Sequence, residues 1–456
     1  MQNVVCFVTD DHAAWALAHA GSAELQTPNL DRLAARGVRF TNAVTPCPVC
    51  SPARACLMTG RMPSEHGIHD WLQEYDPEIG DRDWLAGIET LPEWYQQRGY
   101  HTGLSGKWHL GFHEGAPPGF DWAFGMDRKI NSHNGPIDYF LNGEKLNLEG
   151  NRSRHITGHA LRFLEEWPGD RPFFLNIGYF ATHSPYIENK HDPEVVNLYR
   201  DATFPDLPRL APHPWRKPEN GIPGDSFDEE EARKRWRGYY AAVTEIDREV
   251  GRVLEYLEQT GLLKDTLVIY TADHGLCLGH HGVWGKGNGT RPLNFYEESL
   301  RVPLIIAGPG MEAGKSVDTP VSHLDTHRFL TTNCANHTND SLISEEILNS
   351  RDSRDSLLSS TTFHEYGDSR AIRTPQYKLI RRYHHGPDEL YDLTKDPHER
   401  KNVIEDPTYS QVVAEMDAEL DVFFESHSRD SCDGRRVAAL PRHNDHEAWR
   451  DGLRDR

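Results

Sequence analysis

Short apolar runs, each ending in a polar or glycine-rich cluster, form the main hydrophobic pattern of this chain. The runs occupy residues 4–8, 100–104, 173–180, 267–270 and 304–307. Continuous apolar segments of this length are typical of strands that are buried on both faces of a sheet. The pattern therefore predicts a central sheet whose strands end in polar loops.

Helical periodicity occupies the stretches between these runs. In residues 229–263, apolar side chains step by three or four positions and make one stripe, as expected for a helix against a core: Tyr239, Val243, Ile246, Val250, Val253 and Leu257. Residues 28–36, 91–98 and 154–167 are shorter predicted helices. Alternating strands and helices predict an α/β fold, with a large, mostly parallel sheet sandwiched by helices.

The pattern changes after about residue 339. Residues 361–364, 370–373, 377–383 and 389–393 predict short antiparallel strands, and residues 409–426 predict a helix. We therefore expect two domains, a large one at residues 1–340 and a smaller C-terminal α+β domain at residues 341–456. From residue 428 on, the chain is polar, and we expect a loosely ordered tail.

Four of the predicted strands end in residues that can carry chemistry. These residues are Asp10-Asp11, Lys107-Trp108-His109, Thr182-His183 and Asp273-His274. Ligands of parallel sheets bind beyond the carboxyl ends of the strands, so the four clusters predict one site. Paired carboxylates suit a hard cation such as Ca²⁺ or Mg²⁺, while a histidine also admits a softer metal. For Asp10-Asp11 alone, a helix N-cap is the competing interpretation.

The net charge of the chain limits the kinds of molecule that it is expected to bind. The 456 residues include 49 Lys and Arg against 70 Asp and Glu, a formal net charge of −21. This balance argues against a nucleic-acid or anionic-membrane partner. No run of 18 apolar residues predicts a membrane span. The first residues contain no signal peptide, so we expect either a cytoplasmic protein or an exported one from which the signal has been removed.

One segment of the sequence makes Cys50 a candidate for chemistry. Cys50-Ser51-Pro52-Ala53-Arg54 continues through Ala55-Cys56-Leu57-Met58 to Thr59-Gly60-Arg61. An arginine four residues after the cysteine could lower the pKa of the thiol and bind an anion. Cys47 and Cys50 also form a Cys-x-x-Cys pair, for which a redox function is the competing interpretation, although no thioredoxin-like unit surrounds them.

Cys-x-Pro-x-Arg followed by Thr-Gly-Arg resembles the signature of formylglycine-dependent sulfatases, a family of the alkaline-phosphatase superfamily. The match selects Cys50, because Cys47 lacks the proline at +2 and the arginine at +4. The resemblance covers roughly residues 3–310, and residues 370–403 resemble the family's C-terminal domain. Other segments are similar to further motifs of that family, in its order: Asp10-Asp11, Gly106-Lys107-Trp108-His109-Leu110-Gly111, His183 before Ser184-Pro185, Asp273-His274-Gly275, Trp284-Gly285-Lys286-Gly287 and Tyr296-Glu297-Glu298-Ser299-Leu300-Arg301-Val302-Pro303.

The resemblance implies an alkaline-phosphatase-like fold and a role for each matching residue. Asp10, Asp11, Asp273, His274 and the modified Cys50 would bind one divalent cation, usually calcium in this family. Most relatives have asparagine in place of His274, so Mg²⁺ or another ion is also open. A maturation enzyme would oxidise Cys50 to formylglycine, whose hydrate is the nucleophile. The resemblance also implies that Arg54 contacts the hydrate and that Lys107 and Lys286 bind the sulfate group. His183, with Lys286, would protonate the leaving alcohol, and His109 would remove a proton from the hydrate.

The sequence therefore predicts a sulfatase, and a sulfated carbohydrate is the expected substrate. Candidate contacts to the sugar are Arg291, for a second anionic group, and His66 and Trp71. The first alternative is a phosphonate monoester or phosphodiester hydrolase of the same superfamily, which shares the signature. Another alternative is a non-catalytic binding protein on the same fold. Such a protein would be expected to have lost Cys50, a lysine or a metal carboxylate, and none is lost here.

Overall fold

The structure is a computed structural model that describes residues 2–127, 133–217, 222, 225–333 and 360–450. The boundary expected between residues 340 and 341 lies outside the described residues and stays a prediction. No helix in these ranges is long and apolar enough to cross a lipid bilayer.

A ten-stranded sheet forms the centre of the larger part of the molecule. Its members are β1 (Asn3–Thr9), β2 (Gly37–Phe40), β4 (His101–Gly106), β5 (Trp122–Met126), β6 (Ile137–Leu141), β7 (Glu144–Leu148), β8 (Phe173–Gly178), β9 (Thr266–Ala272), β12 (Leu304–Ala307) and β13 (Lys315–Val317). The strand order is β13-β2-β12-β9-β1-β8-β4-β5-β6-β7. Two short pairs stand apart, β10 (Cys277–Leu278) with β11 (Trp284–Gly285) and β3 (Ala43–Val44) with β14 (Val321–Ser322).

The five strands at the middle of the sheet, β9-β1-β8-β4-β5, are all parallel. The expected mostly parallel sheet is thus confirmed, and all five predicted apolar runs are strands of it. The run at residues 304–307 differs in direction, because β12 pairs antiparallel with both β9 and β2. Its first residue therefore lies at the same edge of the sheet as the last residues of β9.

Both faces of the sheet are covered, which explains why the strands are apolar throughout. On β1, Val4, Cys6 and Val8 pack on one face with side chains of α2 and α5, whereas Val5 and Phe7 pack on the other with α1, α6 and α8. The helices are α1 (Pro28–Arg36), α2 (Cys50–Thr59), α3 (Pro63–His66), α4 (Pro77–Gly80), α5 (Leu91–Gln97), α6 (Arg152–Glu166), α7 (Pro193–Asn197), α8 (Glu229–Gln259), α9 (Glu297–Leu300), α10 (His323–Asn333) and α12 (Ser410–Ser426).

Helix α8 is shorter than the pattern predicts. Its apolar stripe continues to residue 263, but the helix ends at Gln259, and Gly261 follows in the left-handed conformation with φ 73°. Glycine adopts that conformation without steric cost and commonly terminates helices. Residues 262–265 continue as a short 3₁₀ turn.

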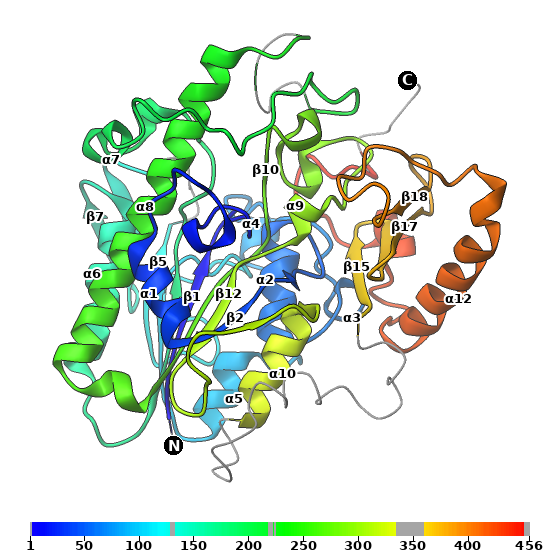
Figure 1. The fold of residues 1–456 in the computed structure, drawn as a ribbon. Coiled ribbons are helices and arrows are strands. Elements are labelled where there is room, and N and C mark those ends of the chain that lie inside the picture. The colour runs from blue at the N-terminus through cyan, green and yellow to red at the C-terminus, as the bar shows by residue number, and fades with distance from the viewer. Residues whose placement is uncertain (1, 128–132, 218–221, 223–224, 334–359, 451–456) are drawn as a thin grey trace.

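The C-terminal part contains the expected small antiparallel sheet. It consists of β15 (Thr362–Tyr366), β16 (Ser369–Arg373), β17 (Tyr377–Arg382) and β18 (Glu389–Asp392), paired in that order. Helix α12 packs against this sheet through Met416, Leu420 and Phe424. Figure 1 shows the sheet and α12 on the side of the molecule opposite α6 and α8.

The expectation of a loosely ordered tail is wrong for residues 428–450. This segment, which we call the C-terminal strap, packs on the larger part of the molecule and buries His443, Glu447 and Trp449. Its backbone is tied to residues 67–73, with the His443 carbonyl accepting from the Gln73 amide at 2.9 Å. The polar composition that suggested disorder instead supplies hydrogen bonds to another part of the chain.

Candidate active site

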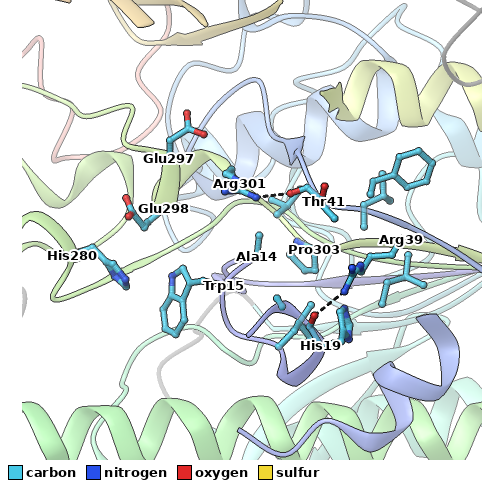
Figure 2. Close-up of a pocket in the computed structure, with 16 residues that line it drawn as sticks. Ala14, Trp15, His19, Arg39, Thr41, His280, Glu297, Glu298, Arg301 and Pro303 are labelled. Atoms are coloured by element: carbon cyan, nitrogen blue, oxygen red, sulfur yellow. Dashed lines mark hydrogen bonds between the residues drawn. The ribbon is translucent and has the colours of Figure 1, made fainter. Parts of the chain in front are cut away.

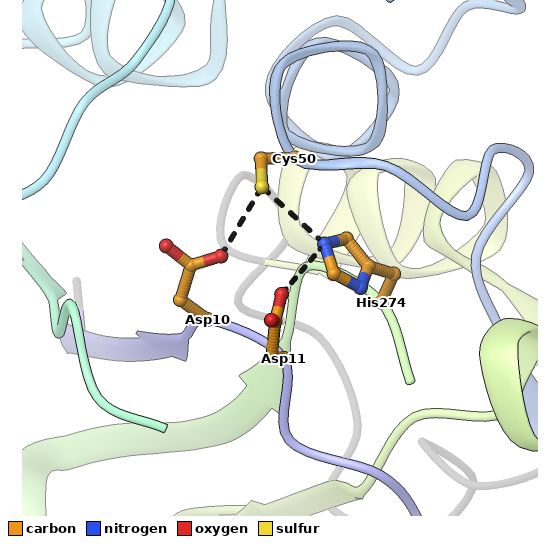
Figure 3. Close-up of side chains that lie close together, drawn as sticks. All are labelled: Asp10, Asp11, Cys50 and His274. Carbon is orange, nitrogen blue, oxygen red and sulfur yellow. Dashed lines mark hydrogen bonds and ion pairs between the residues drawn. The ribbon is translucent and has the colours of Figure 1, made fainter. Parts of the chain in front are cut away.

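The four strand-end clusters meet at one place, together with the start of α2. Asp10 and Asp11 follow β1, His274 follows β9, and Cys50 is the first residue of α2. Figure 3 shows the four side chains converging from these three elements. One ligand atom of each lies within 4.8 Å of the corresponding atoms of the other three, a spacing that could hold a metal ion.

The Cys50 thiol lies at the centre of this group. Its Sγ is 3.3 Å from Oδ1 of Asp10, 3.4 Å from Nε2 of His274 and 2.9 Å from Nζ of Lys286. Every residue of α2 is buried, so the helix presents its N-terminus inside the protein. The positive end of the helix dipole and the free amides there favour an anion beside Cys50.

Charges around the thiol outweigh its burial. Burial alone would raise the pKa of Cys50, but the ammonium groups of Lys107 and Lys286 lower it well below the usual value, with further contributions from His109 and His183. A side chain at this position is thus set in a strongly electropositive environment, although the whole chain is acidic. Such an environment binds and polarises an anion.

The carboxylates have basic partners of their own. Lys107 donates to Oδ2 of Asp10, and Lys286 donates to Oδ1 of Asp11 at 2.6 Å. Asp273 lies next to the group of four: its Oδ1 accepts from the Asp11 amide at 3.2 Å, and its Oδ2 accepts from Nε of Arg54 at 3.0 Å. Nη2 of Arg54 is buried, lies 4.0 Å from Oδ2 of Asp10 and has no hydrogen-bond partner within the described residues.

The residues present fit a divalent cation. Asp10, Asp11, Asp273 and His274 are each at most 1% exposed, and burying carboxylates is costly unless positive charge compensates them. Burial and repulsion from Asp10 raise the pKa of Asp273, despite the opposing effects of His274 and Arg54. The donor atoms of Asp10, Asp11 and His274 are thus buried and close enough together to share one divalent cation.

Two histidines that interact with the Cys50 thiol, His109 and His183, complete the predicted set. His183 lies 3.0 Å from the Ser184 carbonyl through Nδ1, so that Nε2 is free to face Cys50. Burial lowers the pKa of His183 and so does Lys286, but Asp11 and Asp10 raise it above the ordinary value. His109 is held by its Nε2, 2.9 Å from the Leu72 carbonyl. A protonated His183 is the form that a general acid requires.

The predicted sugar contacts divide into two groups. The His66 ring is only 3% exposed; Nδ1 accepts from the Ile68 amide at 3.1 Å and Nε2 lies 3.5 Å from Sγ of Cys56, so the structure does not bring it to the site. Trp71 precedes Leu72, which bonds both His109 and Ser51. Arg291 donates to the His446 carbonyl, and the His446 ring stacks on Trp71 with centroids 6.5 Å apart.

Two parts of the site escaped the sequence analysis. Tyr186 donates its hydroxyl hydrogen bond to Oδ2 of Asp11 at 2.8 Å, and its position three residues after His183 was the only available signal. The C-terminal strap places Asn444 and His446 beside Trp71, with Nδ2 of Asn444 donating to the Trp71 carbonyl at 2.9 Å. No local pattern connects residues 71 and 446, because only the folding of the strap brings them together.

Comparison with known families agrees with this geometry. A model of the sulfatase family matches residues 2–331, and a model described as N-sulphoglucosamine sulphohydrolase, C-terminal, matches residues 279–425. Because the first match covers more than half of the sequence, the chain belongs to the sulfatase family. It is a sulfuric ester hydrolase of the alkaline-phosphatase superfamily, which confirms the resemblance found in the sequence.

Individual relatives and solved structures are similar to this chain over most of its length. An N-acetylglucosamine-6-O-sulfatase of Bacteroides thetaiotaomicron is 26% identical over 91% of this chain and 84% of its own length. Among solved structures, a complex with its substrate D-glucosamine-2-N,6-O-disulfate has a TM-score of 0.75 at 22% identity and covers 93% of this chain and 98% of that one. A phosphonate monoester hydrolase of Agrobacterium radiobacter has a TM-score of 0.72 at 22% identity, with 94% and 96% covered. At such identities, the structural matches establish the fold.

Proposed function

We propose that this protein hydrolyses sulfate esters of a sulfated carbohydrate, with formylglycine made from Cys50 as the source of the nucleophile. The observation that carries the proposal is the position of Cys50, at a buried helix N-terminus, within 2.9–3.4 Å of Lys286, Asp10 and His274. A maturation enzyme that oxidises Cys50 is a required partner of this proposal.

A divalent cation, most simply Ca²⁺, would be held by Asp10, Asp11, Asp273 and His274 together with the modified residue 50. When bound, the cation would withdraw electron density from the sulfate group and neutralise the carboxylates. The all-oxygen character of the aspartates favours Ca²⁺, and the imidazole of His274 admits other ions.

The other side chains have separable tasks. Lys107, Lys286 and Arg54 surround the place where sulfate oxygens would lie and stabilise their charge. His183, whose pKa is raised above the ordinary value, gives a proton to the alcohol that leaves as the ester bond breaks. One hydroxyl oxygen of the formylglycine hydrate bonds to the sulfur as the alcohol leaves. His109 then removes the proton of the second hydroxyl of this sulfated hydrate, so that sulfate is released and the aldehyde is restored.

The rim of the site supports a carbohydrate substrate. His446 contacts both Trp71, through ring stacking, and Arg291, through its carbonyl. An indole can stack on a sugar ring, and a guanidinium can bind a second anionic group. One relative is named for N-acetylglucosamine 6-O-sulfate, and one structural neighbour holds a disulfated glucosamine. These observations favour an amino sugar with more than one sulfate group.

The test is sulfate release from defined compounds by the wild type and by Cys50→Ala. The panel holds mono- and disulfated amino sugars, choline sulfate and an aryl sulfate. We expect disulfated sugars to be cleaved fastest, the variant to lose essentially all activity, and intact mass to show a lighter residue 50 in the wild type. Equal release by the two proteins would rule out the mechanism.

A phosphonate monoester or phosphodiester hydrolase is the second candidate, favoured by the structural neighbour with that activity. The same assay with phosphonate monoesters and phosphate diesters decides between them. Turnover of these compounds without any turnover of sulfate esters would replace the present proposal.

A further inference from the structure

A second group of potential metal ligands lies outside the site described above. It consists of Nε2 of His281 and one carboxylate oxygen each of Glu298 and Glu399, and these atoms all lie within 4.8 Å of one another. His281 belongs to a 3₁₀ turn between β10 and β11, Glu298 to α9, and Glu399 to the segment after β18. Three separate parts of the chain thus bring one imidazole and two carboxylates together.

Surrounding contacts hold the three side chains in place. The His281 ring stacks on Tyr296, with centroids 3.7 Å apart and planes within 6°, and its Nε2 is 2.9 Å from Oε2 of Glu298. Glu399 accepts from the Glu297 amide through Oε2 at 2.9 Å, and Lys378 lies 2.6 Å from Oε1. Rigidly held ligands lose little conformational entropy when a cation binds.

Burial makes these side chains unlike an ordinary acidic surface cluster. The side chains of His281, Glu298 and Glu399 are 7%, 18% and 1% exposed. Burial raises the pKa of Glu399 and so does repulsion from Glu297, although Lys378 and His281 oppose the shift. Lys378 is shared, since it also lies 2.7 Å from Oε1 of Glu297. A further cation beside Glu399 would relieve this repulsion.

A neighbouring cavity reaches one of the three side chains, Glu298, and has room for water. It has a volume of about 340 Å³, and its lining includes Trp15, His280, Glu298 and Arg301. Figure 2 shows Glu298 and His280 together at one end of this cavity, with His19 and Arg39 at the other. An ion that reaches Glu298 can therefore keep water ligands, which a site with only three protein ligands needs.

We propose that His281, Glu298 and Glu399 form a second divalent-cation site, with Zn²⁺ as its preferred ion. Imidazole nitrogen favours Zn²⁺ over Ca²⁺, and Zn²⁺ readily combines histidine with carboxylate and water ligands. The ion replaces the present contact between His281 and Glu298. Since Glu399 comes from the C-terminal part and the other two from the larger part, the ion links the two. This inference does not depend on the proposed function.

The experiment is equilibrium dialysis of metal-stripped protein against Zn²⁺, followed by elemental analysis. We expect two Zn²⁺ ions per wild-type chain, because the site around Asp10 also takes the ion. His281→Gln and Glu399→Gln are expected to bind one ion fewer. Asp10→Asn is also expected to lose one ion, whereas His281→Gln combined with Asp10→Asn loses both.

His280→Gln is the matched control. His280 is the neighbour of His281 in sequence, but its Nδ1 accepts from the Leu278 amide at 3.3 Å and it lies outside the ligand group. We therefore expect His280→Gln to bind two Zn²⁺ ions per chain, as the wild type does. Glu298→Gln keeps a hydrogen-bond acceptor for His281, and it replaces His281→Gln or Glu399→Gln in the assay if either of these variants fails to fold. Zn²⁺ is expected to raise the melting temperature of Asp10→Asn but not of the double variant. Equal Zn²⁺ content in the wild type, His281→Gln and Glu399→Gln would overturn the proposal.

Discussion

At the scale of single residues, Tyr186 is a positioning residue for the candidate metal site. Asp11 uses Oδ1 for Lys286, so the hydroxyl of Tyr186 is the contact that orients Oδ2. Groups that orient a ligating carboxylate commonly affect metal affinity almost as strongly as the ligands do.

We therefore expect Tyr186→Phe to lower metal affinity or kcat by about 10–100-fold, while stability changes little. Ca²⁺ titration of metal-stripped protein, with sulfate release as the second readout, measures the effect. Tyr199→Phe is the control, because that hydroxyl accepts from the Gln26 amide and lies away from the site. Unchanged metal affinity in Tyr186→Phe would assign the tyrosine a purely structural role.

A second residue links stability to pH. Glu245 lies on α8, is 4% exposed, and its Oε1 has no hydrogen-bond partner among the described residues. Burial, helped by repulsion from Glu249, raises its pKa from 4.5 to about 7. Folding therefore favours the protonated form, and this contribution to stability is lost as the pH rises from about 4.5 through 7.

Glu245→Gln is expected to stabilise the protein at pH 8, because glutamine carries no charge to bury. The gain should be on the order of 3 kcal/mol at most and should shrink as the pH approaches 4.5. Urea unfolding at several pH values measures it, with Glu255→Gln, exposed on the same helix, as the control. A gain that does not vary with pH would contradict the assignment.

At the scale of elements, the close approach of α8 to the loop after β8 positions part of the site. A Cβ atom on Gly238 of α8 would lie 1.7 Å from the Tyr186 carbonyl oxygen. The glycine is thus required by the neighbouring loop, which carries His183 as well as Tyr186. Helix propensity alone would favour alanine there by about 1 kcal/mol.

Gly238→Ala should consequently displace this loop and reduce kcat/KM on the order of 10²-fold, as misplacement of reacting groups typically does. Gly158→Ala on α6 is the matched control, since no atom lies within 4 Å of the added Cβ. The control should keep full activity and gain a little stability. Steady-state kinetics and thermal melts of both variants test the prediction, and full activity of Gly238→Ala would contradict it.

At the scale of the whole molecule, the C-terminal strap connects the small sheet to Trp71, a candidate substrate contact. Trp449 packs on Tyr366 of β15, with ring centroids 6.5 Å apart, and the strap then carries His446 and Asn444 to Trp71. The packing of Trp449 on the small sheet therefore helps to position His446 and Asn444 beside Trp71.

Trp449→Ala is expected to cost roughly 3–5 kcal/mol of stability and to raise KM for disulfated sugars more than it lowers kcat. Leu420→Ala is the control, since this buried side chain on α12 packs in a different cluster. It should lose comparable stability with KM unchanged. An unchanged KM in Trp449→Ala would show that the strap has no part in substrate binding.

Much of the catalytic arrangement could be predicted from the sequence, because its determinants are local. Five strands of the large sheet, including the four that end at the candidate site, are apolar runs that end in a polar or glycine-rich cluster. Parallel strands bring their carboxyl ends to one edge of the sheet. Asp10, Lys107, His183 and Asp273 are placed at one edge in this way, and the Cys50–Arg54 signature selects Cys50 as the source of the proposed nucleophile.

Tertiary structure alone decided the rest. The direction of β12, the burial of His66, the contact of Tyr186 with Asp11, and the packing of the strap on Trp71 all join residues distant in sequence or depend on how neighbours fill space. The group of His281, Glu298 and Glu399 is of the same kind. The local pattern of apolar and polar residues cannot predict such contacts, because they form only when elements distant in sequence pack together. Hydrogen bonds between these distant segments then determine which polar residues become ordered.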